Sequence, residues 1–168
     1  GDEILRAEAS GAAAPDFLPG GLLKNDDYRT NKLVLRRIHA KDVTWTMGKV
    51  GADGSDTSVQ PARTVTLTED YYLGVYPLTQ GQLEKFDAGA STSFAPTYSY
   101  GKGNGFPVYN LSYDTYRGSK SAGYDWPNNP PLHAVAPNSF LGKLRAHVGQ
   151  GLEFDLPTEA QWEFACRA

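Results

Sequence analysis

The side chains best suited to chemistry lie near the C-terminal end of this 168-residue chain. Glu159 and Glu163 are four residues apart, which places two carboxylates on one face of a helix, and paired carboxylates can perform acid–base catalysis. Cys166, the one cysteine, follows on the same predicted helix and is a candidate nucleophile. A structural interpretation is simpler for each. Glu159 lies at the positive end of the helix dipole, and we expect Cys166 to be a small buried core residue.

The histidines and a loop of oxygen-bearing residues do not follow metal-binding patterns. A metal ion needs several ligands that converge on one point, and no His-x-x-x-His or Glu-x-x-His spacing occurs. The loop residues lack the spacing of an EF-hand. We expect structural or surface roles for the histidines and a solvated loop for the others. The residues concerned are His39, His133 and His147, and Asp53, Ser55 and Asp56.

Two further short motifs have weak functional content. Gly101–Gly105 is rich in glycine but matches neither the dinucleotide fingerprint nor the phosphate-binding P-loop, so we expect a turn. Asn110-Leu111-Ser112 has the form of an N-glycosylation sequon. Because it falls inside a strand predicted over Pro107–Tyr113, we expect Asn110 to remain unmodified.

The composition describes one ordinary globular domain. Hydrophobic residues make up 40% and charged residues 21%, and the net charge of −3 gives no electrostatic reason to expect nucleic acid as a partner. No apolar run is long enough for a membrane span, and a single cysteine excludes an internal disulfide framework. The 18 glycines, 11 prolines and 12% aromatic residues indicate many turns and a core built from rings.

Two helix starts carry the same device, the capping box. Thr79 is followed three residues later by Gln82, and Thr158 by Gln161. The first predicted helix ends near Gly89. In the last helix we expect Trp162, with Phe164 and Ala165, to form the buried face.

The other predicted elements are short. Asn138 or Ser139 is expected to cap a helix that ends at Gly149. A short helix is also predicted around Glu3–Glu8. Period-2 patterns and β-branched residues predict strands over residues 32–38, 43–47, 64–67 and 71–76.

Four segments, taken in order, resemble the formylglycine-generating-enzyme (sulfatase-modifying-factor) family. Leu-Pro-Thr-Glu-Ala-Gln-Trp-Glu-Phe-Ala at residues 156–165 is similar to the family's Leu-Pro-Thr-Glu-Ala-Glu-Trp-Glu-Tyr-Ala and is the most specific. Trp-Thr-Met-Gly at 45–48 resembles a family strand end. Residues 65–86 and 106–113 resemble the family's Val-Thr helix block and its Pro-Val-x-x-Val-Ser-Trp segment.

The resemblance implies a C-type-lectin-like α+β fold of short strands, two or three short helices and much irregular chain. We predict an N-terminal extension or linker over residues 1–31 and the N-terminal portion of the domain over 32–168, an incomplete domain. The expected partner is the C-terminal remainder of the same domain or a second copy of the chain, which would cover Trp162.

The family includes copper enzymes that make formylglycine from a sulfatase cysteine, non-haem iron enzymes of the ergothioneine type, and non-catalytic binding and display proteins. In the copper enzymes the paired cysteines and the calcium ligands follow the Leu-Pro-Thr-Glu-Ala block. Here Asp155 replaces the family's usual Arg, and Gln161 its second Glu. We therefore assign no catalytic, cofactor or metal residue, although calcium or copper is compatible with a full-length protein.

Our interpretation is a non-catalytic member that binds a ligand on its loops. The alternative is a metal-dependent oxidase of the formylglycine-generating or ergothioneine-type class, with catalytic residues beyond Ala168. Tyr-rich loops bind at low entropic cost, although core packing explains the rings equally well. The acidic composition and linker-like start suit a bacterial exported or cell-surface protein. The candidate ligand surface comprises Tyr98, Tyr100, Tyr116, Tyr124 and Trp126.

Overall fold

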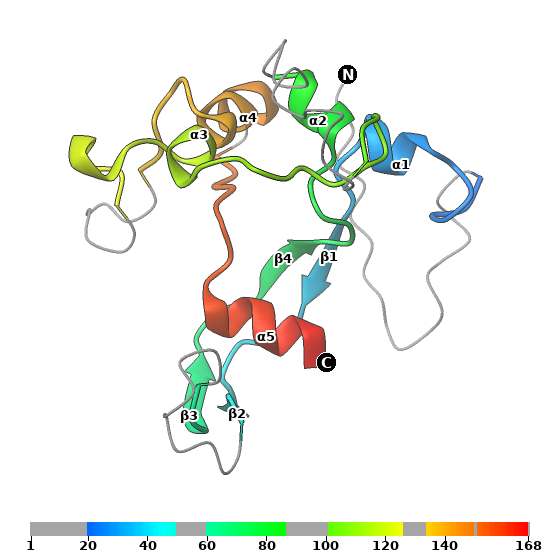
Figure 1. Cartoon of the computed structure of the whole chain (residues 1–168). Helices are drawn as coiled ribbons and strands as arrows, with labels where there is room; N and C mark the ends of the chain where they lie inside the picture. Colours follow the sequence, from blue (N-terminus) through cyan, green and yellow to red (C-terminus); the bar gives the residue numbers. More distant parts are fainter. Residues whose placement is uncertain (1–19, 50–59, 87–100, 126–133, 150, 168) are drawn as a thin grey trace. The chain divides into compact units, whose positions relative to one another are not determined.

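The computed structural model describes residues 20–49, 60–86, 101–125, 134–149 and 151–167. These residues form two compact units, here called the first unit (20–34 and 74–155, apart from the gaps) and the second unit (35–73 and 156–167, likewise). Both are built from short elements, labelled in Figure 1. Short strands and few helices give a mixed α+β class, as the family resemblance implies. No described helix is long and apolar enough to cross a membrane.

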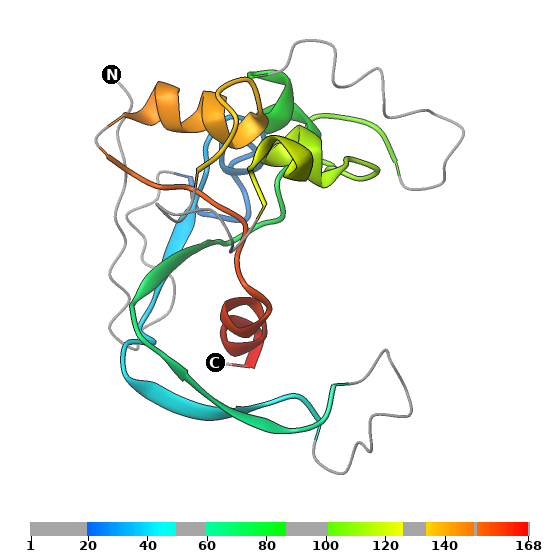
Figure 2. The same cartoon turned by 90° about the vertical axis from the view of Figure 1, so that its left-hand side faces the viewer.

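The second unit contains the strands and the last helix. β1 (Leu35–Ile38) pairs with β4 (Tyr71–Gly74), and β2 (Val43–Met47) pairs antiparallel with β3 (Arg63–Leu67). α5 (Glu159–Arg167) contacts β2 and β3 and lies on the concave side of the curved strands in Figure 2. All four predicted strands are confirmed, with β1 and β4 shorter than expected.

The core of the second unit joins strands to helix. Its buried members are Ile38, Ala40 and Leu67, and Phe164 and Ala165 of α5 pack against them. Trp45 and Phe164 meet edge to face, with ring centroids 5.5 Å apart. Aromatic pairs in this geometry add about 1 kcal/mol beyond the area that they bury.

The first unit is mainly helical. It contains α1 (Asp27–Thr30), α2 (Gln80–Glu84), α3 (Tyr113–Tyr116), the 3-10 turn η2 (Lys120–Ala122) and α4 (Phe140–Val148). Its core combines α2 and α4, and the rings of Phe86 and Tyr116 lie edge-on to Phe140. The fully buried core residues are Leu83, Phe140, Leu141 and Leu144.

The capping predictions for α2 and α4 are confirmed. The Oγ1 atom of Thr79 accepts from the N–H of Gln82, and the side chain of Gln82 accepts from the N–H of Thr79 at 2.9 Å. Ser139 caps α4 by accepting from the N–H of Gly142 at 3.1 Å. Gly149 follows the last residue of α4 with φ of 63°. α2 ends at Glu84, before the predicted stop at Gly89, which lies outside the described residues, as does the helix predicted at Glu3–Glu8.

The strand predicted over Pro107–Tyr113 is wrong. Only its beginning pairs, through a bridge between Thr79 and Pro107 and a bond from the N–H of Val108 to Leu78. Asn110 then turns the chain with φ of 57°, and Ser112 caps α3. The valine, tyrosine and leucine of this segment favour a strand, but local capping by a serine outweighs that preference.

The described part of the predicted linker packs into the first unit. Tyr28 of α1 is only 1% exposed. The hydroxyl of Thr79 donates to the carbonyl of Arg29, and the Gln82 amide donates to the carbonyl of Lys32 at 2.7 Å. The capping residues of α2 therefore also hold residues 29–32, while the domain boundary near residue 31 stays a prediction.

Candidate ligand-binding site

The most deeply buried charge of the first unit holds the base of a candidate binding loop. Arg117 follows α3 and its side chain is 2% exposed, while that of Asp155 is 9% exposed. The guanidinium donates to both carboxylate oxygens of Asp155, at 2.7 and 2.9 Å. This is the bidentate geometry that makes arginine–carboxylate pairs strong.

The remaining donors of Arg117 reach the loop itself. One of them bonds the carbonyl of Tyr124 and lies 3.2 Å from the hydroxyl of Tyr113, which in turn donates to the same carbonyl at 3.1 Å. The hydrogen bonds with Asp155, opposed by burial, raise the pKa of Arg117 above its usual value. The arginine is therefore always charged, and it fixes the backbone of Tyr124 with a satisfied buried ion pair.

Close packing also shapes this loop. Gly118 has φ of 114°, and a Cβ there would lie 2.6 Å from the Cβ of Ala136 and 2.9 Å from the ring of Tyr124. Lys120 and Asp125 form an ion pair at 3.4 Å across the turn. Residues 117–125 thus form a defined segment, here called the platform.

The structure describes only two of the five residues of the predicted aromatic ligand surface, Tyr116 and Tyr124. Tyr124 is half-buried on the platform, whereas Tyr98, Tyr100 and Trp126 lie outside the described residues. Tyr116 packs against the core beside Phe140, and burial raises the pKa of its hydroxyl. For Tyr116 the core interpretation therefore accounts for the ring, and a ligand surface remains a prediction for the other four.

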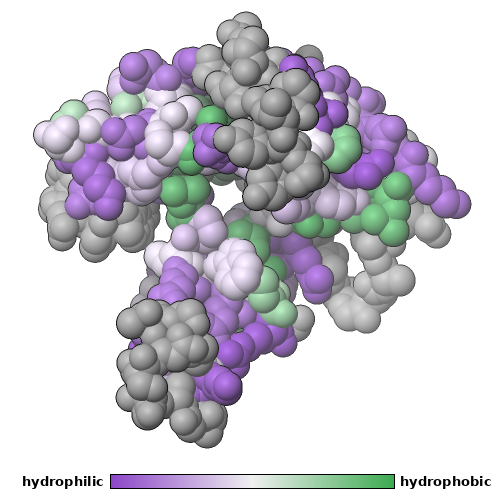
Figure 3. Space-filling view, in the orientation of Figure 1, coloured by the Kyte–Doolittle hydropathy of each residue, from purple (hydrophilic) through white to green (hydrophobic). Residues whose placement is uncertain are grey.

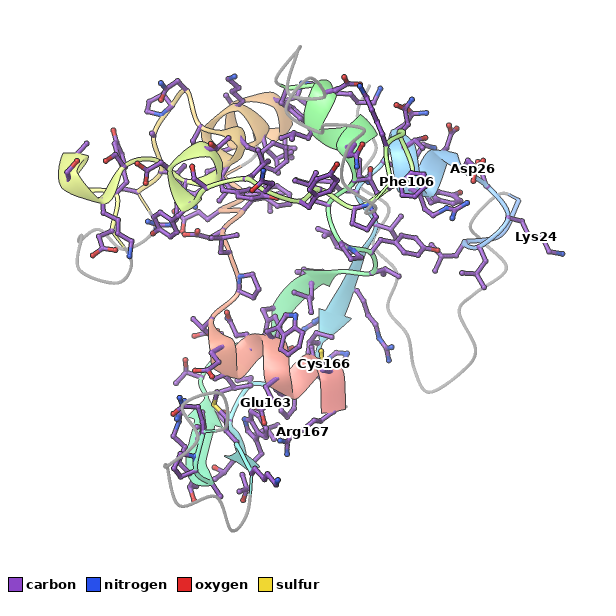
Figure 4. All side chains as sticks on the ribbon, in the orientation of Figure 1. Lys24, Asp26, Phe106, Glu163, Cys166 and Arg167 are labelled. Carbon is purple, nitrogen blue, oxygen red and sulfur yellow. The ribbon has the colours of Figure 1, made fainter. Side chains whose placement is uncertain are left out.

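A second loop is held by Gln80 of α2. Its side-chain amide donates to the carbonyls of Gly101 and Pro107, and its oxygen accepts from the N–H of Gly103 at 3.1 Å. The ring of Phe106, labelled in Figure 4, lies so close to Gly101 that a Cβ there would be 2.3 Å from it. Gly101–Gly105 is therefore a turn, as predicted, and its glycines allow the aromatic ring to pack on the backbone.

The C-terminal motif forms a structural clamp in the second unit. Oε1 of Glu163 accepts from the N–H of Gly48 at 2.9 Å, and Arg167 donates to the carbonyl of Gly48 at 3.0 Å. Arg167 also pairs with Glu163, and Figure 4 shows both side chains extending from α5 toward β2 and β3. The backbone N–H and the carbonyl of Gly48 are therefore both hydrogen-bonded by side chains of α5.

The other motif residues also act locally. Thr158 and Gln161 exchange hydrogen bonds at 3.2 and 2.8 Å, so the predicted second capping box is present. Glu159 pairs with Arg63 at 3.3 Å, an exposed ion pair that contributes about 0–1 kcal/mol. The two glutamates therefore contact different partners rather than converging on one atom.

Two expectations of burial on α5 are not met within the described residues. Trp162 is 56% exposed, and Cys166 is exposed as well. That the C-terminal remainder of the domain or a second copy of the chain covers Trp162 stays a prediction. Helical spacing placed Trp162 on the apolar stripe, but Phe164 and Ala165 are the residues that meet the strands. Figure 3 shows pale and light green residues at the position of α5, and Figure 4 shows Cys166 on a different side of the helix from Glu163.

Asp70 has a strongly lowered pKa, and the cause is a structural role. Its Oδ1 accepts from the N–H groups of Lys41 and Ala40, at 3.0 and 2.9 Å, and Arg37 donates to Oδ2 at 3.0 Å. These bonds, the one from Lys41 foremost, lower its pKa to about 2 against the opposing effect of burial. The carboxylate ties the turn between β1 and β2 to the segment before β4.

The described residues do not fit a metal ion. Among them, no group of three or more histidine, cysteine, aspartate or glutamate side chains converges. His147 packs its ring against Phe86, with centroids 5.4 Å apart, and His39 lies 3.4 Å from Asp70. His133, Asp53, Ser55 and Asp56 are outside the described part. We derive no chemistry through copper or calcium from these residues.

The short strands and helices, together with the contacts of Glu163 and Arg167 with Gly48, define an α+β domain. In it, helix α5 holds the end of strand β2 at Met47–Gly48. The family described as the FGE-sulfatase, sulfatase-modifying factor enzyme 1-like domain, matches residues 35–168. The chain therefore belongs to this family, whose domain implies a C-type-lectin-like fold. Comparisons with curated proteins and with solved structures gave no match.

Sequence reasoning did not identify the residues that anchor the loops. Arg117, Gln80 and Asp70 each hold a segment distant in sequence, and nothing local marks them. One signal was available for the first: Asp155 stands where the family usually has arginine. A buried carboxylate requires an opposite charge elsewhere in the chain, and Arg117 provides it for Asp155.

Proposed function

We propose that this chain is a non-catalytic member of the family, a scaffold that binds a ligand on its loops. One observation carries the proposal: Glu163, in the family's most specific segment, is occupied by the N–H of Gly48 and by Arg167. The Glu163 carboxylate is therefore engaged in holding Gly48 at the end of β2. The chemically capable residues of this segment thus stabilise the domain.

The platform of residues 117–125 supports the binding half of the proposal. The buried guanidinium of Arg117, paired with Asp155, donates a hydrogen bond to the backbone carbonyl of Tyr124 and so fixes its position. A rigid base lowers the entropy lost when a loop orders around a ligand. Tyrosine adds contact area with few rotatable bonds. Among the described residues, we expect the side chain of Tyr124 to contact the ligand.

The test combines binding with chemistry on the full-length protein. Arrays of immobilised oligosaccharides and peptides, read with and without calcium, serve as probes. We expect Tyr124→Ala to lose binding and Tyr72→Ala to retain it, because Tyr72 is a 47% exposed tyrosine on β4, away from the platform in sequence and in a different unit.

The enzyme alternative has its own readout. The same protein is incubated with copper, oxygen and a cysteine-containing sulfatase peptide, and the peptide mass is followed. Conversion of cysteine to formylglycine at stoichiometric copper would replace the binding proposal with the oxidase. We expect an unchanged peptide.

A further inference from the structure

We infer that Asn110 is an acceptor site for N-linked glycosylation. Asn110, Leu111 and Ser112 form the one Asn-x-Ser/Thr sequon of the 168-residue sequence. A sequon alone defines only a candidate, because the asparagine must also lie on a surface that tolerates a bulky glycan. The structure supplies this second condition.

The backbone around Asn110 has left the pairing that the sequence predicted. The N–H of Val108 donates to the carbonyl of Leu78 at 2.8 Å, and this is where the strand-like pairing ends. Asn110 is exposed with φ of 57°, a left-handed conformation that asparagine adopts more readily than most residues. Within the described part of the chain, its side-chain amide makes no hydrogen bond.

The neighbours of Asn110 hold it at the surface. Tyr109 and Leu111, on either side, pack against the core of the first unit, so the asparagine between them is left to solvent. Ser112 is exposed too, and its hydroxyl accepts from the N–H of Thr115 at 3.3 Å as the cap of α3. A glycan on Asn110 therefore displaces no core side chain and leaves the cap intact.

The modification is a transfer from a lipid-linked diphospho-oligosaccharide. The amide nitrogen of Asn110 forms a bond to C1 of the first sugar, and the bond from C1 to the diphosphate oxygen breaks. The lipid diphosphate leaves with the electron pair, and the amide nitrogen loses one proton. No oxidant or reductant is needed.

The experiment is secretion of the full chain from a eukaryotic host that carries out N-glycosylation. We expect one glycan on the native sequence, removable by a peptide N-glycosidase with conversion of Asn110 to aspartate. Asn110→Gln should abolish it. Ser112→Thr is the matched variant, because it keeps both the sequon hydroxyl and the helix cap, and it should retain the glycan.

An Asn-Gly-Thr tripeptide added at the C-terminus shows whether the machinery reached the molecule. Modification of this tripeptide without modification of Asn110 overturns the inference. We also expect the same melting temperature before and after enzymatic removal of the glycan. A melting temperature that rises on removal would contradict the statement that the glycan displaces no core side chain.

Discussion

Glu163 and Gly48 are separated by 115 positions in the sequence, yet the carboxylate of one accepts the N–H of the other at 2.9 Å. Arg167, one turn further along α5, donates to the Gly48 carbonyl. Two of the segments that resemble the family, Trp45–Gly48 and Leu156–Ala165, are therefore two sides of one contact. Their combined presence in the sequence has a direct structural reason.

The Glu163 contact can be tested by shortening the side chain. Glu163→Ala removes the acceptor of the Gly48 N–H, and we expect a loss of about 1–3 kcal/mol in the free energy of unfolding, the range for a lost partner of a charged hydrogen bond. Glu163→Gln keeps an acceptor oxygen and should lose less. Urea denaturation measures both, and equal losses would contradict the role given to the Gly48 bond.

Gly48 itself should not tolerate a side chain. A Cβ there would lie 2.5 Å from the carbonyl oxygen of Pro61, and φ is 87°. We expect Gly48→Ala to cost about 1–2 kcal/mol for the left-handed backbone and about 1–3 kcal/mol more for the clash. Gly149→Ala is the control, since Gly149 also has positive φ but nothing within 4 Å of a Cβ. Thermal melts that show no difference between the two would refute the packing argument.

The Arg117–Asp155 pair should be far more costly to break than to replace. Asp155→Ala leaves a buried guanidinium without its carboxylate, and we expect a loss of about 3–5 kcal/mol. The double variant Arg117→Met with Asp155→Leu should recover part of that loss, because Arg145, 3.7 Å from Asp155, also loses this carboxylate. Denaturation of the native protein, of Asp155→Ala and of the double variant measures the three free energies of unfolding. A double variant no more stable than Asp155→Ala would argue against a pair isolated from solvent.

Acid should destabilise the second unit through Asp70. Its folded-state pKa of about 2 lies below the ordinary value of 3.8, so the carboxylate stabilises the fold above pH of about 4. This stabilisation should decrease as the pH falls from about 4 to about 2, where the folded protein also becomes protonated. Asp70→Asn should be less stable at neutral pH and should show a flatter pH profile. Melting temperatures across this range provide the measurement, with a parallel profile in the variant as the contrary result.

Local signals in the sequence determined a substantial part of the architecture. The Thr79 and Thr158 capping boxes, the serine cap of α4 and the strands β2 and β3 follow from residue types within a few positions of one another. Such features depend on short-range hydrogen bonds and on side-chain periodicity, which a single sequence displays. The family segments added the overall class.

Tertiary structure alone decided which side chains are buried and which loops are held. Helical periodicity could not tell that Phe164 rather than Trp162 meets the strands, because that depends on the rotation of α5 against β2 and β3. Nor could local propensity show that Asn110 would leave strand pairing. Arg117 and Asp155 find each other across 38 positions, and Glu163 and Gly48 across 115, because burial makes an unpaired polar group costly wherever its partner lies in the chain.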